Sequence, residues 1–340
     1  MSLNPSPKIL IIRRDNIGDL VCTTPLIAAL RRRFPQAWLG ALVNSYNAPV
    51  LDDNSDLDEV FVYTKAKHRG AGVSLPSILW RRLQMMRRLR TLAIDDVVIA
   101  TTSPQPRVVK LAQWLRPKRI IGFGKVAGLD IALPVDDAGR HEVDDVFRLA
   151  ALYGIEGTPP GCRVFAAREA TPRAFTVGVH ISARKPSQRW PAEHFATTMQ
   201  AIAAQGPVRF LLLWSPGAED NPLHPGDDAK AREVLAKVGA GATVIAKPTQ
   251  TLQELIAALA DCDAVICADG GAMHLAAGLG KPIVCLFGDS GAARWHPWGA
   301  PYRLLQKKSR DVRDIQVDEV LAAFNALRAD TPAPSAATGP

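Results

Sequence analysis

The feature that most constrains the fold of this chain is a repeated alternation of short apolar segments with longer helical segments. The short segments are rich in β-branched residues and are bounded by turn residues. This alternation is typical of α/β proteins with parallel strands. The expected strands are 8–12, 38–43, 59–63, 96–100 and 119–123 in the first half, and 176–181, 208–214, 243–246, 264–268 and 283–287 in the second.

The chain is long enough for two domains, because 340 residues exceed what one core usually organises. Helical periodicity is clear over 141–155, 229–238, 251–262 and 317–328. It lapses between 156 and 175, a stretch rich in Gly, Pro and small residues that we interpret as a linker. The sequence predicts α/β domains over 1–165 and 166–328 with a cleft between them, and a disordered tail over 329–340.

Composition places the protein among soluble globular proteins, with 47% hydrophobic and 22% charged residues. No apolar run is long enough to span a bilayer, and the N-terminus lacks the features of a secretory signal. These observations predict a cytoplasmic protein. The cysteines are scattered within apolar runs without metal-type pairing to His, so we expect reduced core thiols and no metal site.

Positive charge is concentrated in the first half of the chain. Residues 1–165 hold 23 Lys and Arg against 16 Asp and Glu, a net charge of +7, whereas residues 166–340 hold 18 against 17, a net charge of +1. Between Lys65 and Ile94 there are eight basic residues and no acidic one. Such a run is either a solvated helix face or a surface for an anionic ligand, an anionic membrane or nucleic acid.

The loop "RRDNIGD" follows the first strand, and ligands of open α/β sheets bind at the carboxyl ends of strands. Gly18 allows close backbone approach, and Asp19 lies where the next helix begins. Asp19 is then either a helix N-cap or a general base that takes a proton from an acceptor hydroxyl. Arg13 and Arg14 either hold an anion or form an ordinary loop surface.

The loop "ADGGAMH" follows the strand over 264–268 and leads into a helix over 272–279. Gly270 and Gly271 expose backbone N–H groups at the start of this helix, an arrangement that suits a phosphate or diphosphate. Asp269 ends the strand. His274 is either a core or capping residue or a hydrogen-bond donor to phosphate.

Two further loops carry polar side chains beyond strand ends. The loop after 176–181 leads into a helix at "WPAEHF", with Pro191 in its first turn. Its hydroxyl and cationic side chains, which a diphosphate would need, are Ser182, Arg184, Lys185 and Arg189. After 208–214, Glu219 is either a solvated acid or an acceptor for ribose hydroxyls.

Several functional motifs are missing from the sequence. It contains no P-loop, no Gly-x-Gly-x-x-Gly after the first strand, no His-Glu-x-x-His and no Gly-x-Ser-x-Gly. This argues against a nucleotide hydrolase, a common dehydrogenase, a metalloprotease and an α/β-hydrolase.

Three segments together resemble glycosyltransferase family 9, the ADP-heptose:lipopolysaccharide heptosyltransferases: "RRDNIGDLVCTTPLIAALRRRFP", "RWPAEHF" and "ADGGAMHLAAGLGKPIVCLFGDSGAARWHPWG". The match runs from about residue 8 to residue 326 in the family's order. The resemblance implies a GT-B architecture of two Rossmann-like domains, the first holding the acceptor and the second the nucleotide-sugar. It also implies an inverting transfer from ADP-heptose that needs neither a metal nor a cofactor.

The resemblance also implies roles for individual residues. Asp19 matches the family's general base. Arg13 matches a basic residue that contacts the anionic acceptor or the donor phosphate, and acceptor contacts are also expected from Arg14 and Asn16. Donor contacts are expected from Ser182, Lys185, Arg189, Glu219, Asp269, Gly270, Gly271 and His274. Two positions depart from the family: Gln188 stands where lysine is usual, so the cations for the phosphate must come from Arg184, Lys185 or Arg189, and Gly270 stands where many members carry Thr or Ser.

The basic first half fits an anionic lipopolysaccharide core acceptor, with Kdo or heptose as the accepting sugar, and peripheral contact with the inner membrane. Two alternatives remain. One is an enzyme that uses another nucleotide-sugar, either as a transferase or as an epimerase or hydrolase. The other is a non-catalytic relative that binds an anionic glycan or a membrane. The sequence shows no recognised nucleic-acid-binding fold, so we expect no nucleic-acid partner.

Overall fold

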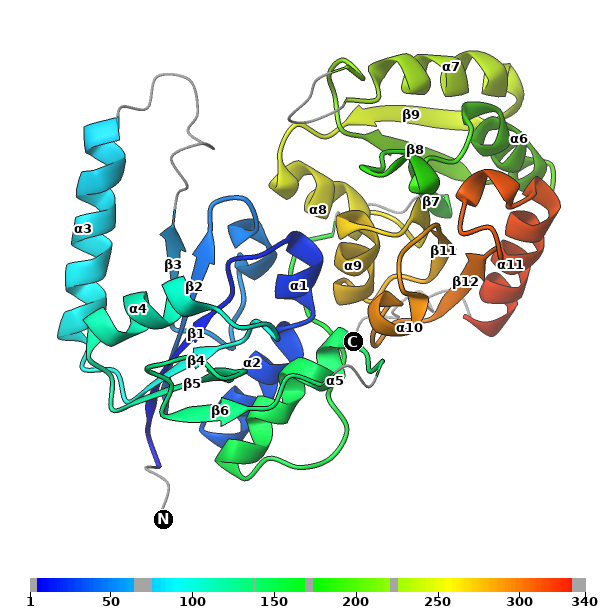
Figure 1. Ribbon diagram of the computed structural model, residues 1–340. Coiled ribbons are helices and arrows are strands. Elements are labelled where there is room, and N and C mark those ends of the chain that lie inside the picture. Colours follow the sequence, from blue (N-terminus) through cyan, green and yellow to red (C-terminus); the bar gives the residue numbers. More distant parts are fainter. Residues whose placement is uncertain (1–4, 64–74, 137–138, 169–173, 221–225, 332–340) are drawn as a thin grey trace, which may run out of the picture. The chain divides into compact units, whose positions relative to one another are not determined.

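Figure 1 shows the computed structural model of the protein, which describes residues 5–63, 75–136, 139–168, 174–220 and 226–331. The chain divides into two compact units, Met1–Phe165 and Ala166–Pro340, and each is described by itself. The part of the basic stretch over 65–74 and the part of the expected tail over 332–340 lie outside the described residues.

The first unit is built on a six-stranded sheet in the order β3-β2-β1-β4-β5-β6, in which every neighbouring pair is parallel. Its strands are β1 Lys8–Ile12, β2 Trp38–Asn44, β3 Glu59–Tyr63, β4 Asp96–Ile99, β5 Arg119–Phe123 and β6 Ile131–Leu133. The central strands β1, β2 and β4 are almost wholly buried, as their near-continuous apolar sequences require when helices cover both faces of a sheet.

Helices cover both faces of this sheet (Figure 1). Its helices are α1 Ile17–Val21, α2 Thr24–Arg33, α3 Leu75–Thr91, α4 Pro106–Leu115 and α5 Glu142–Phe147, with 3₁₀ turns η1 Ala48–Leu51 and η3 Arg148–Tyr153. The helix α4 lies next to α3 and packs on β4 and β5, and α2 packs with α5 and η3. One apolar core joins Leu10, Ile12 and Val97 of the sheet to Leu89 of α3 and Val109 of α4.

The second unit repeats the same topology, with all-parallel strands in the order β12-β11-β10-β7-β8-β9. The strands are β7 Thr176–His180, β8 Arg209–Trp214, β9 Thr243–Pro248, β10 Ala264–Ala268, β11 Ile283–Phe287 and β12 Tyr302–Gln306. Its helices are α6 Ala192–Ala203, α7 Asp228–Val238, α8 Leu252–Ala260, α9 Gly271–Gly278, α10 Ala292–Trp295 and α11 Val317–Asp330, with 3₁₀ turns η4 Pro186–Gln188, η5 Gly239–Gly241 and η6 Val312–Asp314. The helix α6 packs with α7 and α11, and α8 packs with α9.

Both sheets reverse their winding direction between the first and the fourth strand in chain order. In the first unit this switch point lies between β1 and β4, and in the second it lies between β7 and β10. Ligands of doubly wound sheets bind beyond the carboxyl ends of the strands at such a point. The topology therefore directs attention to the loops after these four strands.

The predicted α/β class and ten expected strands are confirmed, but the sequence patterns missed β6 and β12. The strand β6 is only three residues long, and β12 is an edge strand whose residues are all partly exposed. The predicted helix over 141–155 is wrong in its second half, which is the 3₁₀ turn η3. Two residues assigned to the tail, Ala329 and Asp330, instead end α11.

The expectation that the cysteines are core thiols is confirmed, because all five are free and buried. Among the described residues, no helix is both long and apolar enough to cross a membrane.

Candidate functional site

Arg13 occupies the switch point of the first unit. It directly follows β1, and its side chain is only 2% exposed. One guanidinium nitrogen, Nη1, donates to the carbonyl oxygen of Ala100 at the end of β4, which joins the two strands that flank the switch point. The prediction that Arg13 could be an ordinary loop surface is therefore wrong.

Three carboxylates surround the Arg13 guanidinium. Nη2 lies 2.8 Å from Oδ1 of Asp19 and 2.8 Å from Oε1 of Glu142, and Nε lies 3.1 Å from Oδ2 of Asp15. Burial opposes the charge of Arg13, but Asp19, Glu142 and Asp15 outweigh it and raise the pKa of the guanidinium. We call these four residues the Arg13 cluster.

Glu142 is the member of the Arg13 cluster that the sequence patterns did not identify. It begins α5, far from the other members in sequence, and its side chain is 1% exposed. In the sequence it is the second residue of "HEVDDVF", a stretch whose apolar periodicity indicates only a helix. An acidic residue fully buried at a helix start needs a cationic partner, and the sequence gives no sign of which one.

Asp19 lies at the third position of α1, and Asn16 is the N-cap of that helix. The alternative that Asp19 is itself the N-cap is wrong. Oδ2 of Asp19 accepts a hydrogen bond from the backbone N of Asn16 at 3.0 Å, which forms one half of a capping box. The same oxygen also accepts from Nδ2 of Asn16 at 2.8 Å. Arg13 holds Oδ1, so both carboxylate oxygens are oriented by neighbouring groups.

Arg14 lines a cavity of about 760 Å³ in the first unit, within the size range of ligand pockets. The cavity lies between the end of β1, α3 and α4. Its charged and aromatic lining consists of Arg14, Asp15, Tyr63, Arg82, Arg107, Lys110 and Trp114. We call it the cationic cavity, because four of these seven side chains are basic and one is acidic.

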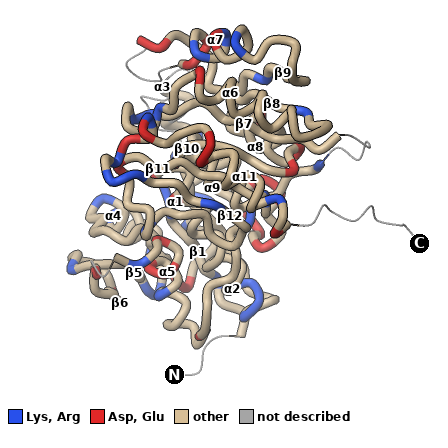
Figure 2. Tube along the Cα trace, turned by 90° about the vertical axis from the view of Figure 1, so that its right-hand side faces the viewer, with Lys and Arg blue, Asp and Glu red and all other residues tan. Residues whose placement is uncertain are grey.

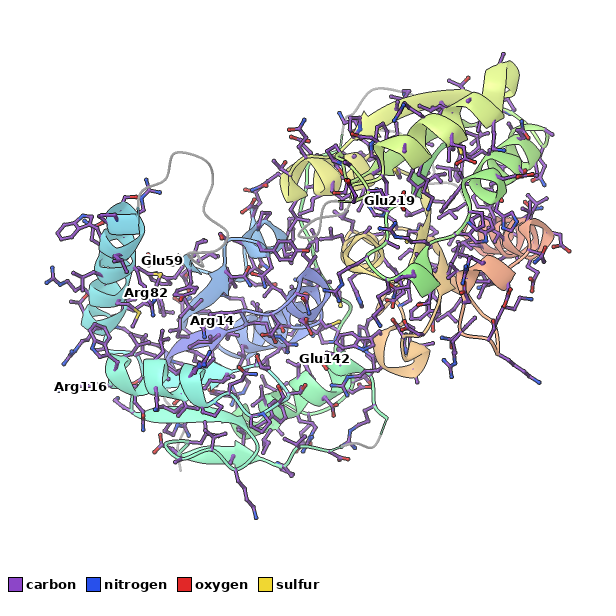
Figure 3. The ribbon with its side chains drawn as sticks, turned by 45° about the horizontal axis from the view of Figure 1, so that its top comes forward. Arg14, Glu59, Arg82, Arg116, Glu142 and Glu219 are labelled. Atoms are coloured by element: carbon purple, nitrogen blue, oxygen red, sulfur yellow. The ribbon has the colours of Figure 1, made fainter. Side chains whose placement is uncertain are left out.

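Tyr63 organises two of the arginines in this cavity. The guanidinium carbons of Arg14 and Arg82 lie 5.1 Å and 4.8 Å from the centre of the Tyr63 ring. Figure 3 labels both arginines, which come from the β1 end and from α3 and lie in the space between α3 and the sheet. Partial burial lowers the pKa of Arg14, and its Nε is a buried donor with no hydrogen-bond partner among the described residues. Asp15 lines the cavity and also contacts Arg13, so the cavity and the Arg13 cluster adjoin.

In the second unit, Asp269 follows β10 and is fixed by a residue whose role the sequence did not indicate. Nε2 of the buried Gln188 donates to Oδ2 of Asp269 at 2.9 Å and to Oγ of Ser290 at 2.9 Å. Gln188 thus ties together the loops after β7, β10 and β11. Gly288 permits this approach, because a Cβ there would lie 2.3 Å from the carbonyl oxygen of Ser187.

The helix α9 presents an uncovered N-terminus beside Asp269. Gly270 is its N-cap and Gly271 its first residue, and a Cβ built on Gly270 would meet nothing within 4 Å. His274, one turn into the helix, is 5% exposed and lies edge-on to Trp295, 6.0 Å between ring centres. Exposed backbone N–H groups at the start of a helix bind anions.

The remaining predicted donor residues lie around the ends of β7 and β8. Ser182 joins the two loops, because its Oγ accepts from the backbone N of Ser215 at 2.9 Å. Nη1 of Arg189 lies 2.5 Å from Oε1 of Glu219, and Nζ of Lys185 lies 3.0 Å from Oδ1 of Asp289. Pro191 was expected in the first turn of α6, but it is the N-cap, and Ala192 begins the helix.

Two titratable residues near these loops were missed by the sequence patterns. Asp227, the N-cap of α7, is 3% exposed; burial raises its pKa, and its Oδ2 has no hydrogen-bond partner among the described residues. Lys230 is one turn further along, donates to the carbonyl oxygen of Ile181 at 2.9 Å, and has its pKa lowered by burial to about 8. The sequence "GDDAK" shows only a helix start, so burial of this pair was not predictable.

Comparison with known proteins identifies relatives over most of the chain. Residues 126–318 match the family model described as "Glycosyltransferase family 9 (heptosyltransferase)". The chain is 24% identical over 311 residues to lipopolysaccharide heptosyltransferase 2 of Escherichia coli strain K12, covering 83% of each protein.

Solved structures show the same fold. A family 9 glycosyltransferase from Veillonella parvula has a TM-score of 0.78 at 20% identity, covering 96% of this chain and 98% of its own. An E. coli heptosyltransferase solved with ADP has a TM-score of 0.76 at 17% identity, covering 94% and 99%. The predicted GT-B-like fold, with two Rossmann-like units, is therefore confirmed.

Proposed function

The chain belongs to glycosyltransferase family 9, and from that membership we propose that it transfers a heptose from ADP-heptose to a hydroxyl of an anionic lipopolysaccharide core acceptor. The relative named lipopolysaccharide heptosyltransferase 2 and the related structure solved with ADP support this choice of donor and acceptor class. The proposed transfer inverts the anomeric configuration and needs no metal, as members of the family are expected to do.

The orientation of Asp19 is the observation that carries the proposal. The carboxylate lies at the switch point of the first unit, with Oδ1 held by Arg13 and Oδ2 by Asn16. Each carboxylate oxygen accepts about two hydrogen bonds. Among the described residues, Oδ2 accepts two hydrogen bonds and Oδ1 accepts one, from Arg13. Oδ1 is therefore the oxygen that we assign to the acceptor hydroxyl.

In the proposed step, Asp19 accepts the proton of the acceptor hydroxyl, and the hydroxyl oxygen attacks the anomeric carbon of the donor. The bond from that carbon to the diphosphate oxygen breaks, and ADP leaves with the bonding electron pair. Negative charge therefore develops on the diphosphate, and groups that stabilise it lower the barrier. Because the nucleophile is the acceptor oxygen and no enzyme-linked sugar forms, configuration at the anomeric carbon inverts.

The loops of the second unit supply groups that suit the departing diphosphate. The N-terminus of α9 at Gly270 and Gly271 is open, and we assign it to the diphosphate. Lys185 and Arg189 supply positive charge, and both are now paired with exposed acids, Asp289 and Glu219, which a ligand can replace. Gln188 stands where the family usually has lysine, and we propose that it serves the donor by holding Asp269.

The cationic cavity of the first unit suits an anionic acceptor. Arg14, Arg82, Arg107 and Lys110 line it, and Asp15 joins it to the Arg13 cluster that holds Asp19. We propose that Arg14 contacts the acceptor directly. Arg13, which is 2% exposed and surrounded by carboxylates, serves the acceptor through its hold on Asp19.

A thermal-shift panel with ADP-, GDP-, UDP- and dTDP-linked sugars tests the donor, because a ligand that binds the folded state raises its melting temperature. We expect the largest rise with ADP-heptose. No rise with any ADP-sugar would overturn the assignment of the donor.

Release of ADP, followed with and without a lipopolysaccharide core acceptor, tests the reaction class. A transferase releases ADP much faster when the acceptor is present. Equal consumption of donor without acceptor would instead indicate a hydrolase, and donor isomerisation without ADP release would indicate an epimerase.

A further inference from the structure

Two buried asparagines lie at the end of β2, beside the loop that leads into α1. Asn44 ends β2, and Asn47 is the N-cap of η1. Their side chains are almost fully buried, with exposed fractions of 2% and 0%. Buried amides in native proteins are hydrogen-bonded, because an unpaired one costs free energy. The hydrogen-bond partners of the two amides therefore show what these asparagines do.

Asn44 uses its whole hydrogen-bonding capacity. Its Oδ1 accepts from the backbone N of Tyr46 at 2.8 Å and from that of Asn47 at 3.0 Å, which closes the turn after β2. Its Nδ2 donates to the carbonyl oxygens of Arg14 at 2.8 Å and Asp15 at 3.0 Å, in the loop after β1. An Asn amide has two donor hydrogens and two acceptor positions. One half of the amide thus serves its own turn, and the other half serves the neighbouring loop.

Asn47 supports the same loop. Its Oδ1 accepts from the backbone N of Asn44 at 3.1 Å, so the two asparagines bind each other. Its Nδ2 lies 3.4 Å from the carbonyl oxygen of Asp15 and 3.5 Å from that of Asn16. The carbonyl oxygens of three consecutive residues, 14–16, therefore all have an amide nitrogen of this pair as a partner.

The loop 14–16 is held from both strands that flank β1. On one side, the parallel register of β1 and β2, continued by two residues, places Asn44 level with Arg14. On the other side, Oγ of Thr101, which follows β4, donates to Oδ2 of Asp15 at 3.1 Å. The segment 38–51, which supplies the two asparagines, contains no charged residue, whereas two basic residues and one acidic residue follow one another in 13–15 (Figure 2). The amides therefore hold the loop without adding charge to it.

We propose that Asn44, together with Asn47, is a positioning residue for sugar transfer, which fixes the loop 14–16 and thereby the carboxylate of Asp19. The connection runs through Asn16, whose backbone N and Nδ2 both bind Oδ2 of Asp19. A displacement of about 1 Å in a reacting group can lower the rate about 10²-fold. This inference rests on the proposed function, because it takes Asp19 as the group that receives the acceptor proton.

Asn44→Asp separates the two halves of the Asn44 amide. The carboxylate keeps the size and the acceptor positions that close the turn, but it removes both donors to the carbonyls of the loop. Asn54→Asp is the matched control. Asn54 is also buried, and its Oδ1 closes a turn by accepting from the backbone N of Asp56 at 3.0 Å. Its Nδ2 has no hydrogen-bond partner among the described residues, so this control removes no donor to another loop.

Hydrogen exchange measured by mass spectrometry tests the hold on the loop without any sugar. The amide of Asn16 donates to Asp19, and the amide of Leu20 donates to the carbonyl oxygen of Asn16, so local opening of the loop exposes both. We expect peptides that cover 13–22 to exchange at least about tenfold faster in Asn44→Asp than in the wild type, and at the wild-type rate in Asn54→Asp. Unchanged exchange in Asn44→Asp would overturn the inference.

Transfer kinetics test whether the hold serves Asp19. We expect Asn44→Asp to lower kcat about 10- to 100-fold while the KM for ADP-heptose changes only a few-fold. When Asp19→Asn is already present, the same substitution should lower kcat less than about twofold, because no base remains to be displaced. A purely structural role would lower kcat by equal factors with and without Asp19→Asn, and that result would overturn the inference.

Circular dichroism and thermal melting check that each variant is folded. Asn44→Ser, whose hydroxyl can donate only one hydrogen bond, replaces Asn44→Asp if that variant does not fold. The two experiments distinguish this inference from the proposed function. If exchange over 13–22 rises in Asn44→Asp but the wild type releases no ADP in response to a core acceptor, the proposed function fails and the hold on the loop stands. If the wild type transfers sugar and Asn44→Asp matches it in exchange and in kcat, the inference fails and the proposed function stands.

Discussion

Nη2 of Arg13 lies 2.8 Å from Oδ1 of Asp19, and the same nitrogen lies 2.8 Å from Oε1 of Glu142. Because Arg13 is buried, its loss takes a buried counter-charge away from Asp19 and Glu142, and breaking a buried ion pair costs about 3–5 kcal/mol. We expect Arg13→Met to lower the free energy of unfolding by that amount, measured by urea denaturation. Arg32→Met, on the exposed part of α2, should have little effect.

Glu142→Gln should have opposite effects on stability in the presence and in the absence of Arg13. In the wild-type protein it removes a partner of Arg13 and should destabilise the fold. With Arg13→Met already present, it removes the charge of a buried carboxylate that has lost Arg13 and should restore part of the stability. Simple additivity of the two changes would show that the two residues are not coupled. Arg13→Lys, which keeps the charge, takes the place of Arg13→Met if that variant does not fold.

Asp19→Asn tests the proposed general base. The amide keeps the size of the side chain but removes the charge that is paired with the buried Arg13 and weakens the capping box, so the free energy of unfolding should also fall, and urea denaturation checks that the variant is folded in the assay. Loss of a general base typically costs about 10²–10⁴-fold in rate. We expect kcat to fall by that factor while ADP affinity, measured by calorimetry, changes only a few-fold. Asp53→Asn, at an exposed turn, is the control, and retained turnover in Asp19→Asn would remove Asp19 as the base.

Gln188→Ala tests whether the hold on Asp269 serves the donor. Without the amide, Asp269 loses a hydrogen bond of 2.9 Å and the loops after β7 and β11 lose their shared tie through Ser290. We expect the affinity for ADP, measured by calorimetry, to fall about tenfold, which corresponds to roughly 1.4 kcal/mol. Gln200→Ala removes an exposed amide from α6 and should leave affinity unchanged. Equal affinities in both variants would show that Gln188 has only a structural role.

The sequence predicted the strands well because buried parallel strands are nearly continuous apolar runs. It also predicted which loops carry polar groups, since those loops follow the strands directly. The missed strand β12 is an edge strand with partial exposure, so it lacks such a run.

Pairings between distant segments were beyond the sequence patterns. Glu142 lies 129 residues from Arg13, and Gln188 lies 81 residues from Asp269. Nothing in a local pattern reveals which buried acid meets which buried cation. For the same reason Arg13 was considered only as a ligand contact or a surface residue, whereas the structure shows it inside a cluster of carboxylates.

Lys230 should make stability depend on pH in the alkaline range. Burial lowers its pKa from 10.5 to about 8 in the folded protein, whereas the unfolded chain keeps the ordinary value. Between these two values the unfolded state therefore binds more protons, so the free energy of unfolding rises with pH across this window. At 1.36 kcal/mol per pKa unit, the full rise is about 3 kcal/mol. Below pH 8 the ammonium is charged in both states and its burial cost is present in full.

Lys230→Met removes this titration while filling similar space. The variant loses the hydrogen bond to the carbonyl of Ile181 and the contact with the ring of Phe195, 5.0 Å away, which lowers stability by a similar amount at every pH. Urea denaturation from neutral pH upward should therefore show a flatter profile through the window for Lys230→Met than for the wild type. Lys237→Met, a more exposed lysine of the same helix, should keep the wild-type slope. If the free energy of unfolding of Lys230→Met still rises with pH as steeply as in the wild type, another group titrates in this window, and burial does not lower the pKa of Lys230.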